Sequence, residues 1–160
     1  MRARLGDRDR DRFERMVEDA FLRIPGRFRR RIQNLAIVVE DEPGIDELRR
    51  ARCPRHSTLL GLYHGIPLTE RTSAYGMVLP DKISIYQGPI ERLARNEREL
   101  RRIVEDTVWH EVGHYFGMNE RQIREAELRW RQAARRRASR PSRPRGDPSG
   151  EPPTDEADGQ

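Results

Sequence analysis

The segment from His110 to Glu120, HEVGHYFGMNE, constrains the fold of this chain more than any other part of its sequence. His110 and His114 are four residues apart, so on an α-helix their imidazoles project from one face, one turn apart, and both can reach a single metal ion. Glu111 is rotated by about 100° from His110 on a helix of about 3.6 residues per turn, which places its carboxylate beside that ion. The spacing therefore predicts a helix with a metal site on one face.

The residues that follow supply a turn and a third ligand. Gly117 can end the helix, because glycine enters the left-handed conformation without penalty. The chain can then reverse and bring Glu120 towards the histidines, which completes a set of two histidines and one carboxylate with an open position for water. We expect His110, His114 and Glu120 to hold Zn²⁺. Glu111 is then the general base for a zinc-activated water, a geometry that serves the hydrolysis of amide bonds.

Apolar periodicity predicts three main helices. The first runs from about Asp9 to Ile24 and ends at Pro25-Gly26. The second lies in a helical region that opens at Gly88-Pro89 and carries the two histidines; its apolar residues recur at three and four positions and cover nearly all sides, which predicts a buried central helix. The third follows the histidine motif, where Asn119 and Gln122 can form a capping box.

Between the first two helices the pattern is mixed. A short second helix is expected at residues 27–32, and the β-branched run LAIVVE at residues 35–40 predicts a strand. A turn and one helical turn follow at residues 41–50. Residues 59–87 alternate in the manner of β-strands and contain several turn residues, so we expect three short strands there.

The charge pattern does not indicate a nucleic-acid partner. The chain carries 32 basic and 27 acidic residues, for a net charge of +5. Acidic and basic residues alternate, as in RDRDRFER at residues 8–15, which is typical of solvated helix faces. The Arg-rich C-terminal end leaves open a role as a nucleic-acid tether.

The remaining composition bears on compartment and domain organisation. Cys53 is the only cysteine, so no intramolecular disulfide can form and a reducing compartment is favoured. With no apolar segment long enough to cross a bilayer, we expect a cytoplasmic protein with no membrane partner. Residues 138–160 are rich in Arg and Pro and then acidic, which predicts a disordered tail after a single domain at residues 9–137.

Further segments resemble the short bacterial zincin-like metallopeptidase family. They are LAIVVEDEP at residues 35–43, LLGLYHGIPLTERT at residues 59–72 and LPDKISIYQGPIE at residues 79–91, and the resemblance spans roughly residues 13–123. It implies metal ligands at His110 and His114, a catalytic Glu111, and a peptide or protein substrate. Similar proteins usually carry Asp where this chain has Glu120.

The resemblance also implies an α+β fold, a minimal zincin-like metallopeptidase domain in which a small twisted mixed sheet packs on the active-site helix and flanking helices. The metal is expected between the edge of the sheet and the helix that carries the histidines. By the same resemblance, residues 71–78 are the candidate edge strand that pairs with an extended peptide.

Alternatives remain open. A zinc-dependent hydrolase of another class, such as the small bacterial endoribonucleases with three histidines, uses similar spacing, and a regulatory module can retain the metal without turnover. The oligomeric state and the substrate stay undetermined. Each of three tyrosines, Tyr63, Tyr75 and Tyr86, can either stabilise an oxyanion or pack the sheet. His64 can bind substrate or simply be exposed. Arg71 can hold a substrate carboxylate or be an ordinary surface residue.

Overall fold

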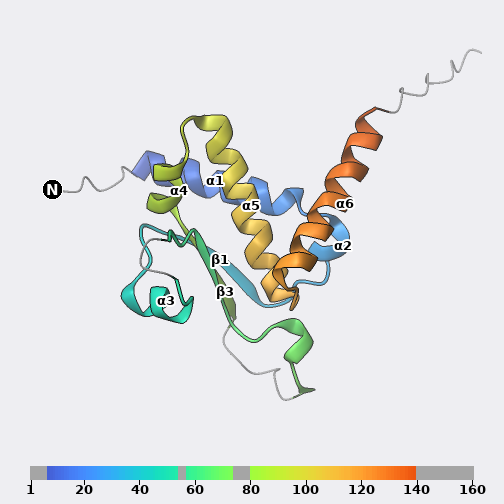
Figure 1. Ribbon diagram of the computed structural model, residues 1–160, viewed down its shortest axis with the longest axis horizontal. Coiled ribbons are helices and arrows are strands. Elements are labelled where there is room, and N and C mark those ends of the chain that lie inside the picture. Colours follow the sequence, from blue (N-terminus) through green and yellow to red (C-terminus); the bar gives the residue numbers. More distant parts are fainter. Residues whose placement is uncertain (1–6, 54–56, 74–79, 140–160) are drawn as a thin grey trace, which may run out of the picture.

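The computed structural model of the protein describes residues 7–53, 57–73 and 80–139. Its elements are α1 (Asp7–Arg23), α2 (Gly26–Arg29), β1 (Leu35–Glu40), α3 (Ile45–Arg50), β2 (Gly61–His64), the 3₁₀ helix η1 (Leu68–Glu70), β3 (Asp81–Tyr86), α4 (Gln87–Leu93), α5 (Glu97–Tyr115) and α6 (Glu120–Ala138). Figure 1 shows the sheet below α5, with α1 crossing behind that helix and α6 rising beside its C-terminal end.

The sheet is mixed and has the order β1-β3-β2 in the described residues. β1 runs parallel to β3, with Leu35 opposite Asp81. β2 runs antiparallel to β3, with Gly61 opposite Ile85. The predicted α+β class with a small mixed sheet against helices is confirmed. Among the described strands, β2 lies beside the histidines of α5.

The main core lies between the sheet and the two helices α1 and α5. Ile83 and Ile85 project from β3 with no exposed surface and join Phe13 of α1 and Val108 of α5 in one apolar cluster. Burying each such side chain stabilises the fold by about 1.5–3 kcal/mol. The predicted burial of α5 on nearly all sides holds only in part: most residues from Val104 onward are buried, but residues 105, 106, 110 and 114 are partly exposed, and residues 97, 98, 101 and 102 are exposed.

The helical region that opens at Gly88-Pro89 is two helices, a break that the periodicity did not predict. α4 ends at Leu93, and α5 begins after Asn96, whose side chain accepts a hydrogen bond of 2.9 Å from the backbone N–H of Glu99. An Asn in this position competes with the helical backbone and starts a new helix instead. The corner between α4 and α5 follows from this cap.

Other expectations have mixed outcomes. The first helix, the strand at residues 35–40 and the Asn119–Gln122 capping box are confirmed. Of the three strands expected at residues 59–87, two are β2 and β3; the third, with most of the candidate edge strand at residues 71–78, lies outside the described residues.

None of the helices in the described ranges is long and apolar enough to cross a membrane. α6 ends at Ala138, so the first residue of the predicted tail at 138–160 is still helical, and residues 140–160 of that tail are likewise outside the described part.

Candidate metal centre

α5 presents both histidines on one face, as their spacing predicts. The ring centroids of His110 and His114 are 4.9 Å apart, and both side chains are partly exposed. Burial lowers the pKa of His114, and the neighbouring His110 lowers it further, while Glu120 and a hydrogen bond to the Met118 backbone raise it. Metal ions need neutral imidazole, so the net lowering favours the ligand form of His114.

The chain reverses after α5 through a Schellman motif. Gly117 has φ +77° and donates to the carbonyl of His114 at 2.9 Å, and Met118 donates to the carbonyl of Gly113 at 3.0 Å. A side chain on Gly117 would be strained at this φ and would also collide with Thr69. The predicted role of Gly117 in ending the helix is therefore confirmed.

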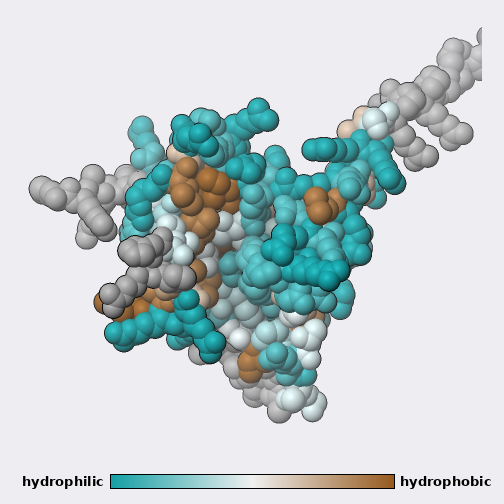
Figure 2. Space-filling model, viewed as in Figure 1, coloured by the Kyte–Doolittle hydropathy of each residue, from teal (hydrophilic) through white to brown (hydrophobic). Residues whose placement is uncertain are grey.

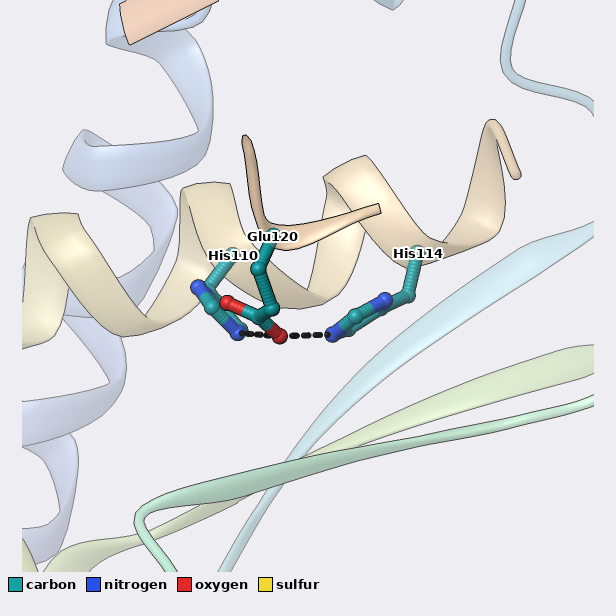
Figure 3. Close-up of side chains that lie close together, drawn as sticks. All are labelled: His110, His114 and Glu120. Carbon is teal, nitrogen blue, oxygen red and sulfur yellow. Dashed lines mark hydrogen bonds and ion pairs between the residues drawn. The ribbon is translucent and has the colours of Figure 1, made fainter. Parts of the chain in front are cut away.

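The turn brings Glu120, the first residue of α6, to the histidines. Its Oε1 atom lies 3.0 Å from Nε2 of His110 and 3.4 Å from Nε2 of His114. Figure 3 shows both imidazoles directed at this one carboxylate oxygen. The structure thus brings together all three residues that the sequence proposed as ligands.

Two contacts fix the position of α6, and with it Glu120. Trp109 donates from Nε1 to the carbonyl of Ile123 at 3.1 Å. Gly113, between the two histidines, packs so closely on Ile123 that a Cβ on this glycine would lie 2.5 Å from the Ile123 Cγ1 atom. The absence of a side chain at Gly113 therefore allows α6 to approach α5.

Glu111 projects from α5 towards the sheet, on the flank of the histidine pair. Its side chain is buried, with 7% of the residue exposed, and its Oε2 atom accepts a hydrogen bond of 2.9 Å from the backbone N–H of Tyr63 in β2. Burial raises the pKa of Glu111 to about 7; the charge of Glu120 adds to this rise, and the Tyr63 hydrogen bond opposes it. A carboxyl group in this range can exchange a proton near neutral pH.

The three donor atoms fit zinc. They lie within 4.8 Å of one another. Zinc binds nitrogen and oxygen ligands at about 2.0–2.2 Å, so two ligands of a tetrahedral site stand about 3.4 Å apart, close to the two distances from Glu120. A cavity of about 520 Å³ opens beside His110, His114 and Glu120 and is bounded by β2, which leaves room for water and substrate.

Two other candidate residues are occupied by structural contacts. The guanidinium of Arg71 pairs with Asp81 and lies 4.9 Å from the centre of the Tyr115 ring. The hydroxyl of Tyr63 donates to Asp81, and burial together with that carboxylate raises the pKa of Tyr63. Both side chains are held by Asp81 of β3, so neither Arg71 nor the Tyr63 phenol points to a substrate role.

The other described candidates are on the sheet. His64 is on β2, where its Nε2 atom is 3.2 Å from Ser84 Oγ and its Nδ1 atom 3.1 Å from Arg50. Tyr86 is fully buried in β3, which agrees with a packing role. Tyr75 lies outside the described residues. Sequence reasoning missed the hydrogen bond from the backbone N–H of Tyr63 to Glu111. No local pattern signals this bond, because it joins residues 48 positions apart.

These features define the chain as a small α+β domain with a candidate metal site on its central helix. The sequence model of the zincin-like metallopeptidase family matches residues 32–130. The protein therefore belongs to the zincin-like metallopeptidase family.

Similarity to individual proteins is more distant. A conserved hypothetical protein from Thermus thermophilus has a solved structure that is 22% identical in sequence, with 67% of this chain and 92% of that chain covered and a TM-score of 0.45. A search of curated proteins gave no match.

Proposed function

We propose that this protein is a zinc-dependent peptidase in which His110, His114 and Glu120 hold the metal and Glu111 is the general base. The observation that carries the proposal is the buried Glu111 carboxylate. A backbone N–H of β2 holds it beside the three donor atoms of His110, His114 and Glu120. Family membership supports the same chemistry. A regulatory metal site does not need a buried carboxyl group with a pKa near neutrality beside its ligands.

When bound, zinc supplies a Lewis acid that polarises a carbonyl and lowers the pKa of its water towards ~7. Orientation and proton transfer depend on residues of the chain itself. The Tyr63 N–H holds one oxygen of Glu111 in place, so the carboxylate keeps a fixed orientation. Its other oxygen can accept a proton from the attacking water and then deliver that proton to the leaving amine.

The position of β2 supports one route for the substrate. This strand borders both the ligand cavity and the face of α5 that carries the histidines. An extended peptide can lie along it and reach the metal, but it cannot use the Tyr63 N–H, because Glu111 already accepts from that group. Substrate binding therefore depends on other backbone groups and on side-chain contacts.

The test is Glu111→Gln, which keeps the shape of the side chain and removes its ability to accept a proton. We expect zinc content to stay at the wild-type level and peptide hydrolysis to fall by ~100-fold to ~10,000-fold. Glu125→Gln makes the same chemical change on the exposed surface of α6 and should leave both quantities unchanged.

Metal analysis and turnover on the same preparation separate the outcomes. Loss of zinc from Glu111→Gln would show that this residue is a ligand or supports one, and the assigned roles would be wrong. Full activity in the variant would place the chemistry elsewhere. A zinc-loaded wild-type protein that cleaves no peptide in a broad library would favour the regulatory alternative.

A further inference from the structure

A second hollow lies on the other side of His110 from Glu120. It has a volume of about 380 Å³ and shares Leu59, Gly61, His110 and Glu111 with the ligand cavity. This volume falls within the about 300–1,000 Å³ range of small-ligand sites. Its walls come from the end of α4, the middle of α5 and residues 59–61 at the start of β2, and we call it the corner pocket.

Aliphatic side chains form much of the wall of the corner pocket. Four aliphatic side chains line it: Leu59, Leu60, Leu93 and Ile103. Leu93, the last residue of α4, is 47% exposed. Figure 2 shows hydrophobic side chains gathered at the surface beside α4 and the first half of α5, with hydrophilic surface around them. When an apolar group fills an apolar hollow that opens to water, the free energy falls because apolar surface is removed from water.

The polar groups at the corner pocket already have partners. The Thr107 hydroxyl donates to the carbonyl of Ile103 at 2.7 Å, and a Cβ on Gly61 would lie 2.8 Å from the Thr107 methyl, so this methyl faces β2. The Asp106 carboxylate accepts from Arg131 at 2.7 Å. The other two polar residues that line the pocket, His110 and Glu111, belong to the proposed reaction centre.

We infer that the corner pocket is a specificity subsite for a large apolar side chain, such as Leu, Met or Phe, of the residue next to the cleaved bond. The inference rests on the proposed peptidase function and names the substrate class that it selects. A substrate lying along β2 with its cleaved bond at His110 and Glu111 places a neighbouring side chain in this hollow. Charged side chains are disfavoured, because the aliphatic walls of the pocket offer no partner to a buried charge.

The experiment uses the zinc-loaded full chain and a set of quenched fluorescent octapeptides. The peptides differ at one position, which carries Gly, Ala, Leu, Phe, Lys or Glu in a constant Ala/Ser background. We expect kcat/KM to be about 10- to 100-fold higher for Leu and Phe than for Gly, because burying that much apolar side chain is worth this ratio. Mass spectrometry of the products should place the varied residue directly beside the cleaved bond.

Leu93→Ala removes part of the apolar wall and should reduce the Leu-to-Gly ratio about threefold. Leu22→Ala is the matched control, because Leu22 is also an exposed leucine, at 60%, on α1 and away from the metal site. This control should leave the rates on both peptides unchanged. Peptide binding to zinc-loaded Glu111→Gln, measured by calorimetry, should show the same Leu preference without turnover.

The outcomes separate the subsite from the peptidase assignment. Equal cleavage of Gly and Leu peptides would overturn the subsite and leave the peptidase assignment intact. An equal change in the Leu-to-Gly ratio in Leu93→Ala and Leu22→Ala would also overturn the subsite. Failure of the zinc-loaded protein to cleave any peptide in the set and in a broad library would overturn the peptidase assignment, and the subsite with it.

Discussion

Adding one methyl group between the two histidines should disturb the metal centre without touching a ligand. In Gly113→Ala, the new Cβ would lie 2.5 Å from Cγ1 and 2.8 Å from Cδ1 of Ile123, closer than such atoms can approach. Ile123 is 1% exposed, so its side chain cannot move into solvent, and α6 must shift away from α5. Because Glu120 begins α6, the candidate third ligand shifts with it.

The magnitude follows from two opposing terms. Overpacking a tight contact costs about 1–3 kcal/mol, and replacing Gly by Ala inside a helix regains about 1 kcal/mol. We therefore expect the free energy of unfolding of Gly113→Ala, measured by urea denaturation of the metal-free protein, to fall by up to about 2 kcal/mol. Displacement of Glu120 should weaken zinc binding by about 10- to 100-fold in competition with a chelator.

A double-mutant cycle isolates the contact. Ile123→Ala alone leaves a cavity and should cost about 2–5 kcal/mol, but it also removes the atoms that the new methyl group meets. In the double variant the two effects should therefore fail to add, with a coupling energy of about 1–3 kcal/mol. Gly44→Ala is the control, since a Cβ there meets only Glu47 Oε2 at 3.5 Å. Strictly additive energies together with wild-type zinc affinity in Gly113→Ala would refute the proposed packing of α6 on α5.

Three further predictions concern the ligand set, pH and the C-terminal end. Glu120→Ala should lower zinc affinity severely, as measured by chelator competition, while circular dichroism shows the fold retained; unchanged affinity would mean that the third ligand lies elsewhere. In the metal-free protein the pKa of Glu111 is raised by burial from 4.5 to about 7, so the folded state holds the proton more tightly than the unfolded state. The contribution of Glu111 to stability should accordingly be largest below pH ~4.5 and fall by about 3 kcal/mol as the pH rises through 7. Glu111→Gln should remove this contribution in urea titrations, and an unchanged slope in the variant would assign the pH dependence to other groups. Removing residues 140–160, which contain too few apolar side chains to offset ordering entropy, should leave Tm nearly unchanged in calorimetry, and a large decrease would show that the tail docks on the domain.

Much of the local structure could be predicted because its causes lie within a few residues of the chain. The strand at residues 35–40 follows from its β-branched run, and the start of α6 follows from Asn119 and Gln122, which cap it three residues apart. Helical spacing alone put His110 and His114 on one face. The reversal at Gly117 depends on the unique freedom of glycine, so the approach of Glu120 was also foreseeable.

Tertiary structure decided what surrounds these residues. The Tyr63 N–H holds Glu111 across 48 positions, and Arg71 pairs with Asp81 rather than facing a substrate. The corner pocket needs α4, α5 and the segment before β2 to meet, and no spacing in the sequence reports that meeting. Helix spacing and caps depend on near neighbours along the chain. The burial and the hydrogen bond of Glu111 depend instead on segments that are distant in the sequence, and these come together only when the sheet packs on α5.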